Sequence, residues 1–378
     1  MRVGLVIYGS LDITSGGNIY DRHLVNILRG HDPNVEHVDL ISLPRTSYPR
    51  CLTHNVSIQL LRRLQHADLD VLLQDELVYP SLFWLNRRLR HRVTFPCVGI
   101  VHHLQSSEVQ PKWRKSCYRP LEHFYLKGLD AFIVNSQHTK HAIQTIVGEA
   151  SPCIVAQPGG DRLIPNLTLD RIRVRSRAAG SLRLLFVGNV IPRKGLATLI
   201  AALEKLAGRA WHLDVVGNED IDLEHTRQIR LQVKHAGLEQ QISFHGHLGD
   251  SSLSEYFSRS HVLTVPSTYE GFGIVYLEGM GFGLPAVACQ VGAVSEIIEH
   301  GANGFLIPPG DVSKLTHYVE QLIQDRSLLE NLSVHANRTY RHHPTWKESL
   351  AQIPNFLTKV INSHRKIEKN EPSQPIQY

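Results

Sequence analysis

Three short stretches of the sequence place charged side chains where a folded chain could do chemistry. Glu270 lies in Tyr-Glu-Gly-Phe-Gly directly after an apolar run, and Glu278 follows eight residues later in a stretch with helical spacing. Arg193 and Lys194 lie in Pro-Arg-Lys-Gly after another apolar run. Two cations above the first amides of a helix are suited to bind a pyrophosphate. Together with carboxylates beside a glycine turn, they predict a site for an anionic, polyhydroxyl ligand.

Two series of alternating strands and helices are expected to position these residues. β-branched apolar runs predict six strands in each half of the chain, and amphipathic stretches between them predict helices. Near-continuous apolar strands that alternate with helices are typical of parallel sheets covered on both faces. We therefore predict an α/β protein with two doubly wound, Rossmann-like domains that face each other across a cleft. The helices expected in the second half cover residues 195–206, 223–236, 252–259, 273–282 and 293–300.

The predicted boundary between the domains lies in residues 161–181, which are polar, rich in arginine and without regular periodicity. We expect an N-terminal domain over 1–165, a linker over 166–181 and a C-terminal domain over 182–345. Residues 346–378 predict a C-terminal helix, which could cross back to the N-terminal domain, and a tail.

Composition describes a globular protein with room for two domains. The chain has 378 residues, of which 42% are hydrophobic and 20% charged. Five cysteines without Cys-x-x-Cys spacing predict buried thiols and not a disulfide framework. No apolar stretch approaches the length of a membrane-spanning helix, so we expect a cytoplasmic protein.

The positive charge is concentrated in the first half of the chain. Residues 1–180 hold 22 lysines and arginines against 15 acidic residues. Residues 83–92 carry four arginines and no acid, and residues 112–127 mix five cations with aromatic side chains. Two interpretations are open: a solvated helix face, or a surface that contacts anionic lipid at the inner face of the membrane. No nucleic-acid-binding module accompanies these stretches, so we expect no nucleic-acid partner.

The motifs of the chain, taken in order, resemble the family 4 retaining glycosyltransferases of GT-B fold. The resemblance runs from about residue 1 to 345 and is densest over 183–311. It implies an enzyme that transfers a sugar from a nucleotide-sugar donor, held by the C-terminal domain, to an acceptor hydroxyl held by the N-terminal domain. The acceptor could be a lipid, a glycan or a small molecule. The motifs are FVGNVIPRKG, VPSTYEGFGIVYLE, GLPAVACQVGAVSEII, NGFLIPPGD, IVNSQHTK and VAQPGGD.

The resemblance also implies a role for each candidate site residue. Glu270 and Glu278 would be the Glu-x7-Glu pair, the first on the hydroxyls of the donor sugar and the second on the nucleotide ribose. Arg193 and Lys194 would bind the donor diphosphate. His102 would lie near the sugar, where it polarises a hydroxyl or stabilises developing charge. The remaining donor contacts would be the amides of Phe272, Gly273, Ile274 and Val275 and the loop that contains Gly16 and Gly17.

The two cations could replace a metal ion at the diphosphate, so we expect catalysis without metal. We expect no cofactor, because the nucleotide sugar, such as a UDP- or GDP-sugar, is a substrate. Asp-x-Asp patterns, which bind divalent ions in metal-dependent transferases, occur at 68–70 and 220–222, but their positions before a strand and before a helix favour turn and cap roles. Two alternatives remain: a sugar-nucleotide epimerase on the same fold, and a non-catalytic sugar-nucleotide-binding protein.

Overall fold

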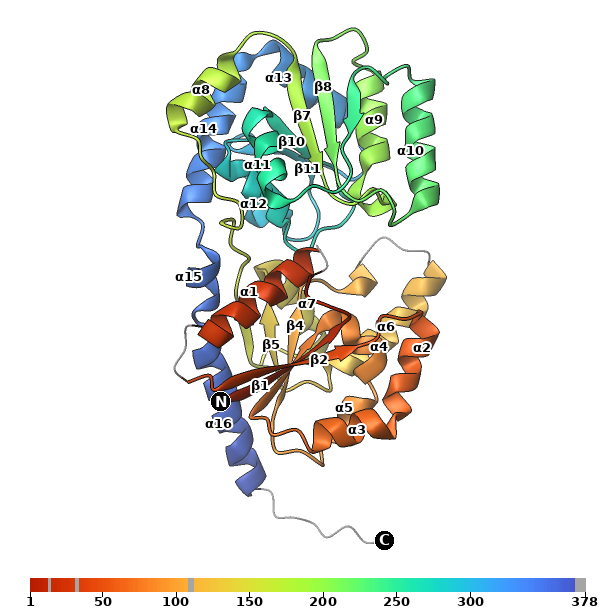
Figure 1. Cartoon of the computed structure of the whole chain (residues 1–378), viewed down its shortest axis with the longest axis vertical. Coiled ribbons are helices and arrows are strands. Elements are labelled where there is room, and N and C mark those ends of the chain that lie inside the picture. Colours follow the sequence, from red (N-terminus) through yellow and green to blue (C-terminus); the bar gives the residue numbers. More distant parts are fainter. Residues whose placement is uncertain (13–14, 31–33, 108–111, 371–378) are drawn as a thin grey trace. The chain divides into compact units, whose positions relative to one another are not determined.

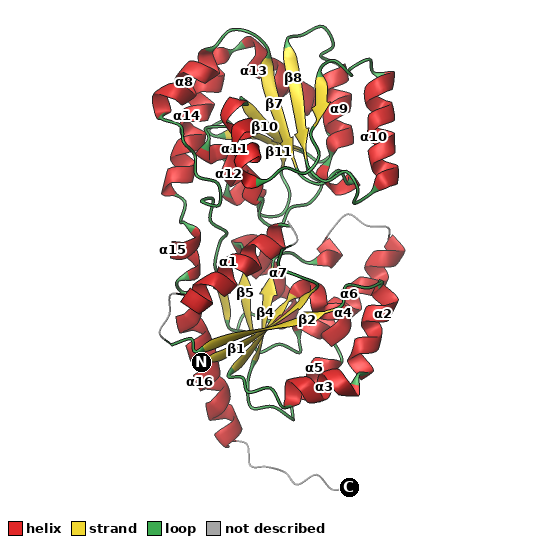
Figure 2. Ribbon diagram, in the orientation of Figure 1, coloured by secondary structure: helices red, strands yellow, loops and turns green. Residues whose placement is uncertain are grey.

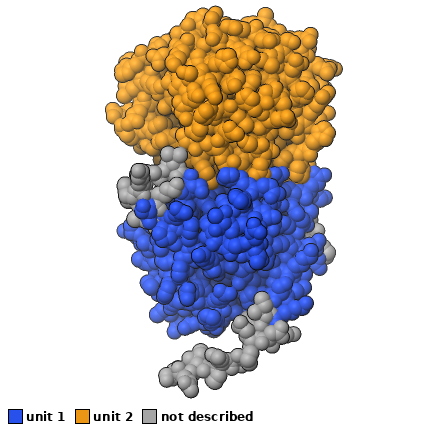
Figure 3. Space-filling model, turned by 180° about the vertical axis from the view of Figure 1, so that it is seen from behind, with its two compact units in different colours: residues 1–158, 347–378 blue, residues 159–346 orange. Residues whose placement is uncertain are grey.

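The computed structural model describes residues 1–378 except 13–14, 31–33, 108–111 and 371–378. The chain divides into two compact units (Figure 3). Unit 1 comprises residues 1–158 with 347–378, and unit 2 comprises residues 159–346. In the described part of the chain, each unit holds one parallel six-stranded sheet. The predicted strands and the α/β fold class are therefore confirmed.

Unit 1 has the strand order β2-β1-β3-β4-β5-β6 (Figure 1). Strand β1 pairs in parallel with β2, the edge strand, on one side and with β3 on the other. The strands are β1 (Arg2–Tyr8), β2 (His37–Leu43), β3 (Val71–Asp75), β4 (Cys97–Val101), β5 (Ala131–Val134) and β6 (Cys153–Val155). The α-helices are α1 (Gly16–Gly30), α2 (Tyr48–Thr53), α3 (Ile58–Gln65), α4 (Tyr79–Leu82), α5 (Leu85–Leu89), α6 (Lys112–Leu126), α7 (Gln137–Val147) and α16 (Ile353–Asn370).

Unit 2 has the order β12-β11-β10-β7-β8-β9, which is the Rossmann order 3-2-1-4-5-6 when its strands are counted from β7. The strands are β7 (Leu182–Val187), β8 (Trp211–Val216), β9 (Ile242–Phe244), β10 (Val262–Val265), β11 (Ala286–Cys289) and β12 (Gly304–Ile307). The α-helices are α8 (Leu169–Arg177), α9 (Leu196–Glu204), α10 (Leu223–His235), α11 (Asp250–Arg259), α12 (Ile274–Gly281), α13 (Val312–Gln324) and α14 (Arg326–His342). A further helix, α15 (Trp346–Leu350), begins at Trp346, the last residue of unit 2.

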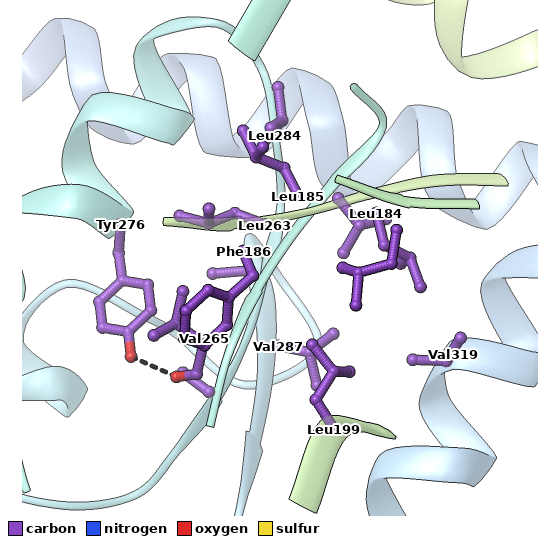
Figure 4. Close-up of a cluster of buried hydrophobic side chains, with 14 of the residues drawn as sticks. Leu184, Leu185, Phe186, Leu199, Leu263, Val265, Tyr276, Leu284, Val287 and Val319 are labelled. Carbon is purple, nitrogen blue, oxygen red and sulfur yellow. Dashed lines mark hydrogen bonds between the residues drawn. The ribbon is translucent and has the colours of Figure 1, made fainter. Parts of the chain in front are cut away.

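Helices flank both sheets, as the apolar strands require (Figure 2). Strands β10 and β11 are buried at every position, because side chains on both faces of the sheet are covered. Strand residues such as Phe186 and Leu263 pack with Tyr276 of α12 in the core of unit 2 (Figure 4). The Tyr276 hydroxyl donates a hydrogen bond of 2.7 Å to the Val265 carbonyl and so fixes α12 to the end of β10.

Two expectations about local structure are wrong. The predicted linker, 166–181, is not irregular, because it contains α8 and belongs to unit 2. The four arginines of α8 obscure its helical pattern in the sequence. One of them, Arg175, donates hydrogen bonds to the carbonyls of Phe282 and Gly283. The stretch 293–300 forms only a three-residue 3-10 turn, Val294–Glu296, and not a helix.

The C-terminal segment packs with unit 1. Residues 347–378 belong to that unit, and Arg365 of α16 donates a hydrogen bond of 2.6 Å to Asp70 at the start of β3. The predicted tail from residue 371 lies outside the described residues. Among the described residues, no helix is long and apolar enough to cross a membrane.

Candidate active site

The strand order of unit 2 places the candidate residues at the carboxyl ends of two neighbouring strands. Strands β7 and β10 are neighbours. The chain continues from β7 to β8 on one side of this pair and from β10 to β11 on the other side. Ligands of doubly wound sheets bind beyond the carboxyl ends of the strands at this point. Arg193 and Lys194 follow β7 in a 3-10 turn, and Glu270 follows β10 in a loop. The structure therefore brings these three predicted residues together.

Two glycines allow the loops at these strand ends to approach each other. Gly195 has a φ of 74°, and a Cβ atom there would lie 2.1 Å from the Pro266 carbonyl oxygen. Gly292 has a φ of 54°, and a Cβ atom there would lie 1.8 Å from the carbonyl oxygen of Glu270. A side chain at either position would push the loops apart. Sequence reasoning missed Gly292, although its place directly after the β11 run was a usable signal.

The Glu270 carboxylate is held by three side chains. Lys194 Nζ lies 2.5 Å from Glu270 Oε1, and Ser267 Oγ donates to the same oxygen at 2.7 Å. Arg193 Nη1 lies 3.8 Å from Glu270 Oε2 and donates to the Tyr269 carbonyl at 2.8 Å. Glu270 is 7% exposed. The carboxylate thus orients both cations at the carboxyl ends of β7 and β10.

Burial and charge act in opposite directions on Glu270. Burial raises the pKa of its carboxyl. The positive charges of Lys194 and Arg193 lower the pKa by more than burial raises it, so the pKa lies below the usual value. Glu270 is consequently ionised at neutral pH. An ionised carboxylate accepts hydrogen bonds from sugar hydroxyls, and the adjacent cations can bind a diphosphate.

Helix α12 begins directly after this loop. The first amides of a helix have no intrahelical acceptor, and its dipole places positive potential at that end. The predicted amides of Ile274 and Val275 belong to this first turn, and those of Phe272 and Gly273 precede it. Their position is suitable for an anion or a sugar oxygen, and their contact with the donor stays a prediction.

Glu278 lies within α12 and already has a partner. Arg162 Nε donates to Glu278 Oε1 at 2.6 Å, and Arg162 Nη2 donates to Glu278 Oε2 at 3.1 Å. The remaining nitrogen, Nη1, donates to Asp250 at 2.5 Å. Burial raises the pKa of Glu278, and Arg162 offsets part of that rise. Sequence reasoning missed Arg162. A buried helical glutamate needs a cationic partner, but the sequence does not show which residue provides it.

In unit 1 the predicted residues His102 and Gly17 lie near the carboxyl ends of the strands. Gly16 and Gly17 open α1, and a Cβ atom on Gly17 would lie 3.0 Å from His102 Cδ2. His102 is buried at the end of β4, whereas the side chain of His103 is 24% exposed. The two neighbours thus differ in environment, as expected for adjacent residues at a strand end.

Three carboxylates that sequence reasoning missed surround His102. Its Nε2 lies 3.2 Å from Asp21 Oδ1 and 3.5 Å from Asp75 Oδ2, and its backbone amide donates to Glu76 Oε2 at 3.0 Å. Burial lowers the pKa of His102, but Glu76 and Asp21 raise it more, so the pKa lies well above the usual value. Asp75 ends β3 and Glu76 directly follows it, and this position at a strand end was the available signal.

The same cluster has side chains of the kinds that bind metal ions. Ligand atoms of Asp21, Asp75 and His102 all lie within 4.8 Å of one another. Carboxylate and imidazole ligands suit several divalent ions. Among the described residues of unit 1, these three could therefore hold a metal.

Of the turn and cap roles predicted for the Asp-x-Asp patterns, the cap role is confirmed for Asp222. Asp68 pairs with Arg2, and Asp70 accepts hydrogen bonds from the Arg2 amide at 2.8 Å and from Arg365. Asp222 caps α10 by accepting from the His225 amide at 3.0 Å. These contacts account for three of the four aspartates.

The basic stretch 83–92 contributes one aromatic surface cluster. Trp84 is 46% exposed, and its ring stacks on Phe124 at 6.1 Å. The Arg87 guanidinium lies 5.7 Å from the centre of the Phe124 ring. The side chains of 112–115 and 117 lie outside the described residues. Contact with an anionic membrane through these stretches stays a prediction.

The comparison with protein families bears on unit 2. Residues 170–339 match the glycosyl transferases group 1 family. The match contains Arg193, Lys194, Glu270 and Glu278, so the residues at the carboxyl ends of β7 and β10 lie inside the domain of that family.

Curated relatives match over part of the chain. An uncharacterized glycosyltransferase of Methanocaldococcus jannaschii is 29% identical over 164 residues, which are 43% of this chain and 41% of the relative. The 2-deoxystreptamine N-acetyl-D-glucosaminyltransferase of Niallia circulans is 26% identical over 43% of this chain and 42% of the relative. The chain thus spans less than half the length of these relatives.

Solved structures match nearly the whole chain in fold. Sucrose-phosphate synthase from Thermosynechococcus elongatus superimposes with a TM-score of 0.79 at 21% identity and covers 96% of this chain and 99% of that one. HepE of Anabaena, solved with UDP and glucose, has a TM-score of 0.74 at 18% identity over 95% of this chain and 100% of that one. The fold is that of the GT-B glycosyltransferases.

Proposed function

We propose that the protein is a retaining glycosyltransferase of family 4 that takes its sugar from a nucleotide-sugar donor. The observation that carries this proposal is the cluster of Arg193, Lys194 and Glu270 at the carboxyl ends of β7 and β10. Unit 2 binds the donor, and unit 1 provides the site for the acceptor hydroxyl. The group 1 domain at residues 170–339 supports the assignment of the donor to unit 2.

In the proposed reaction the bond between the anomeric carbon and the diphosphate oxygen breaks, and a bond to the acceptor oxygen forms on the same face of the sugar. Arg193, Lys194 and the first amides of α12 stabilise the negative charge that develops on the departing diphosphate. The departing phosphate accepts the proton of the acceptor hydroxyl. Glu270 accepts hydrogen bonds from the sugar hydroxyls, and Glu278 accepts hydrogen bonds from the ribose. His102 lies near the sugar and polarises a hydroxyl.

A screen of nucleotide sugars tests this proposal. The protein is incubated with UDP-, GDP-, ADP- and TDP-sugars, and both the melting temperature and the slow release of nucleoside diphosphate are measured. We expect one class of donor to raise the melting temperature and to be hydrolysed. The anomeric configuration of the sugar in the transfer product, read by NMR, should match that of the donor. Absence of binding and hydrolysis with every donor would contradict the proposal.

We predict that transfer does not depend on a divalent ion. The charge on Arg193 and Lys194 can neutralise the diphosphate without Mg²⁺ or Mn²⁺. The initial rate with the identified donor should therefore be unchanged, within about twofold, after dialysis against excess EDTA. A loss of activity that added Mg²⁺ or Mn²⁺ restores would show that the two cations are not sufficient.

A further inference from the structure

Unit 1 contains a cavity at the carboxyl ends of β1, β2 and β3. Its volume is about 210 Å³. In the strand order of this unit β1 lies between β2 and β3, so the cavity opens where the chain connections diverge, the usual position of a ligand site in such sheets. Its lining includes the polar residues Ser10, Asn18, Asp21, Arg45, Tyr48 and Asp75.

Asp75 has one carboxylate oxygen with a partner and one without. Its Oδ1 accepts a hydrogen bond of 2.8 Å from the Leu77 amide. Its Oδ2 is buried and has no hydrogen-bond partner among the described residues. His102 Nε2 is 3.5 Å away and lies closer to Asp21 Oδ1, at 3.2 Å. A buried acceptor without a donor is costly, so this oxygen is the place where a ligand N–H or O–H gains most.

The charges around this oxygen favour a cation over a neutral donor. The carboxyl groups of Asp21, Asp75 and Glu76 are all buried, and His102 is the buried cation between them. His103 lies 3.5 Å from Glu76, on a half-buried side chain. The cation in the cavity lining, Arg45, is exposed. The inner end of the cavity therefore has an excess of acidic groups.

We propose that this cavity binds an amino-substituted polyhydroxyl ring, such as an amino sugar or an aminocyclitol, with its ammonium group on Asp75 Oδ2. Neutral polar side chains of the lining, among them Ser10, Asn18 and Tyr48, contact the ring hydroxyls. The inference rests on the proposed function insofar as the bound ring is the sugar acceptor.

Binding measured without any nucleotide sugar tests the proposal. D-glucosamine, D-glucose and N-acetyl-D-glucosamine are titrated into the full-length protein at pH 7, and their dissociation constants are obtained by ligand-observed NMR. These probes share one ring and differ in the group at a single carbon. We expect D-glucosamine to bind about tenfold more tightly than either neutral probe, because a hydrogen bond between two charged groups is stronger than a neutral one.

The variant Asp75→Asn examines the oxygen itself. Asparagine keeps an oxygen for the Leu77 amide and replaces the carboxylate charge, so the preference for D-glucosamine should fall to about twofold or less. Asp68→Asn is the matched control. Asp68 is an exposed aspartate of the same unit that precedes the first residue of β3, whereas Asp75 is its last residue. The control should keep the wild-type preference. Melting temperatures of both variants show whether the fold is retained.

Three results would overturn the proposal. They are equal binding of all three probes, no binding of any probe at millimolar concentration, and binding of Mn²⁺ or Zn²⁺ that requires Asp75 while D-glucosamine does not bind. Its failure is separable from failure of the proposed function, because donor binding and hydrolysis are measured without an amino sugar.

Discussion

Replacing Lys194 by methionine should lower the rate of sugar transfer by about 10²–10³-fold, the usual effect of removing one group that stabilises charge in a transition state. Methionine keeps much of the length of the side chain and removes the charge. In the structure Lys194 Nζ lies beside Glu270 at the carboxyl end of β10, where the departing diphosphate needs a cation. The turnover number at saturating donor is the quantity to measure.

The control for this variant is Lys205→Met, because Lys205 is an exposed lysine at the end of α9, the helix that follows the Lys194 turn. Its turnover should equal that of the wild type. Loss of Lys194 also leaves Glu270 with only Ser267 and the more distant Arg193, so the melting temperature must be compared as well. A folded Lys194→Met enzyme with wild-type turnover would remove this residue from the proposed chemistry.

Replacing Glu278 by alanine should lower the free energy of unfolding by about 3 kcal/mol, near the lower end of the range for breaking a buried ion pair. The reason is that Arg162, whose side chain is 15% exposed, would lose both hydrogen bonds to the glutamate. Asp250 still pairs with its third nitrogen and limits the loss. Urea denaturation of the two proteins, followed by circular dichroism, gives the difference.

The change Glu224→Ala provides the comparison, because Glu224 pairs with Arg227 on the exposed surface of α10 and its loss should change little. If Glu278→Ala were as stable as Glu224→Ala, the pair with Arg162 would not be formed in solution. Glu278→Gln keeps the shape and one acceptor oxygen, so it separates the effect on donor affinity from the loss of stability.

Much of the fold could be predicted because its strands are short apolar runs that both faces of a sheet bury. The twelve strands match such runs in the sequence. Helix α8 escaped prediction because only Ile172 and Ser176 of its residues are buried, so it lacks a clear apolar face. The prediction for 293–300 failed for the opposite reason: the stretch has helical spacing but forms only a 3-10 turn, and Gly292 and Gly301 on either side of it take positive φ.

The candidate site was predictable where a residue directly follows a strand. Arg193, Lys194 and Glu270 do so, and the strand order brings them together. Arg162 could not be predicted, because it lies 116 positions from Glu278 and only the folded chain pairs them. The carboxylates around His102 likewise come from separate elements, α1 and the end of β3, so their shared cluster depends on the sheet order of unit 1.

The central claim is that Glu270 contacts the donor sugar while Arg193 and Lys194 bind the diphosphate. The most direct test measures the affinities of the Glu270→Ala variant and the wild type for the full nucleotide sugar and for the nucleoside diphosphate alone. A carboxylate that accepts hydrogen bonds from hydroxyls contributes about ten- to a hundredfold, and more in the transition state than in the ground state.

We therefore predict that turnover falls by about ten- to a hundredfold in Glu270→Ala and that the full donor loses affinity relative to the nucleoside diphosphate. Affinity for the nucleoside diphosphate should be unchanged or tighter, because Lys194 no longer pairs with a carboxylate. If Glu270→Ala weakened the nucleoside diphosphate as much as the full donor, Glu270 would not lie at the sugar, and the account would be contradicted.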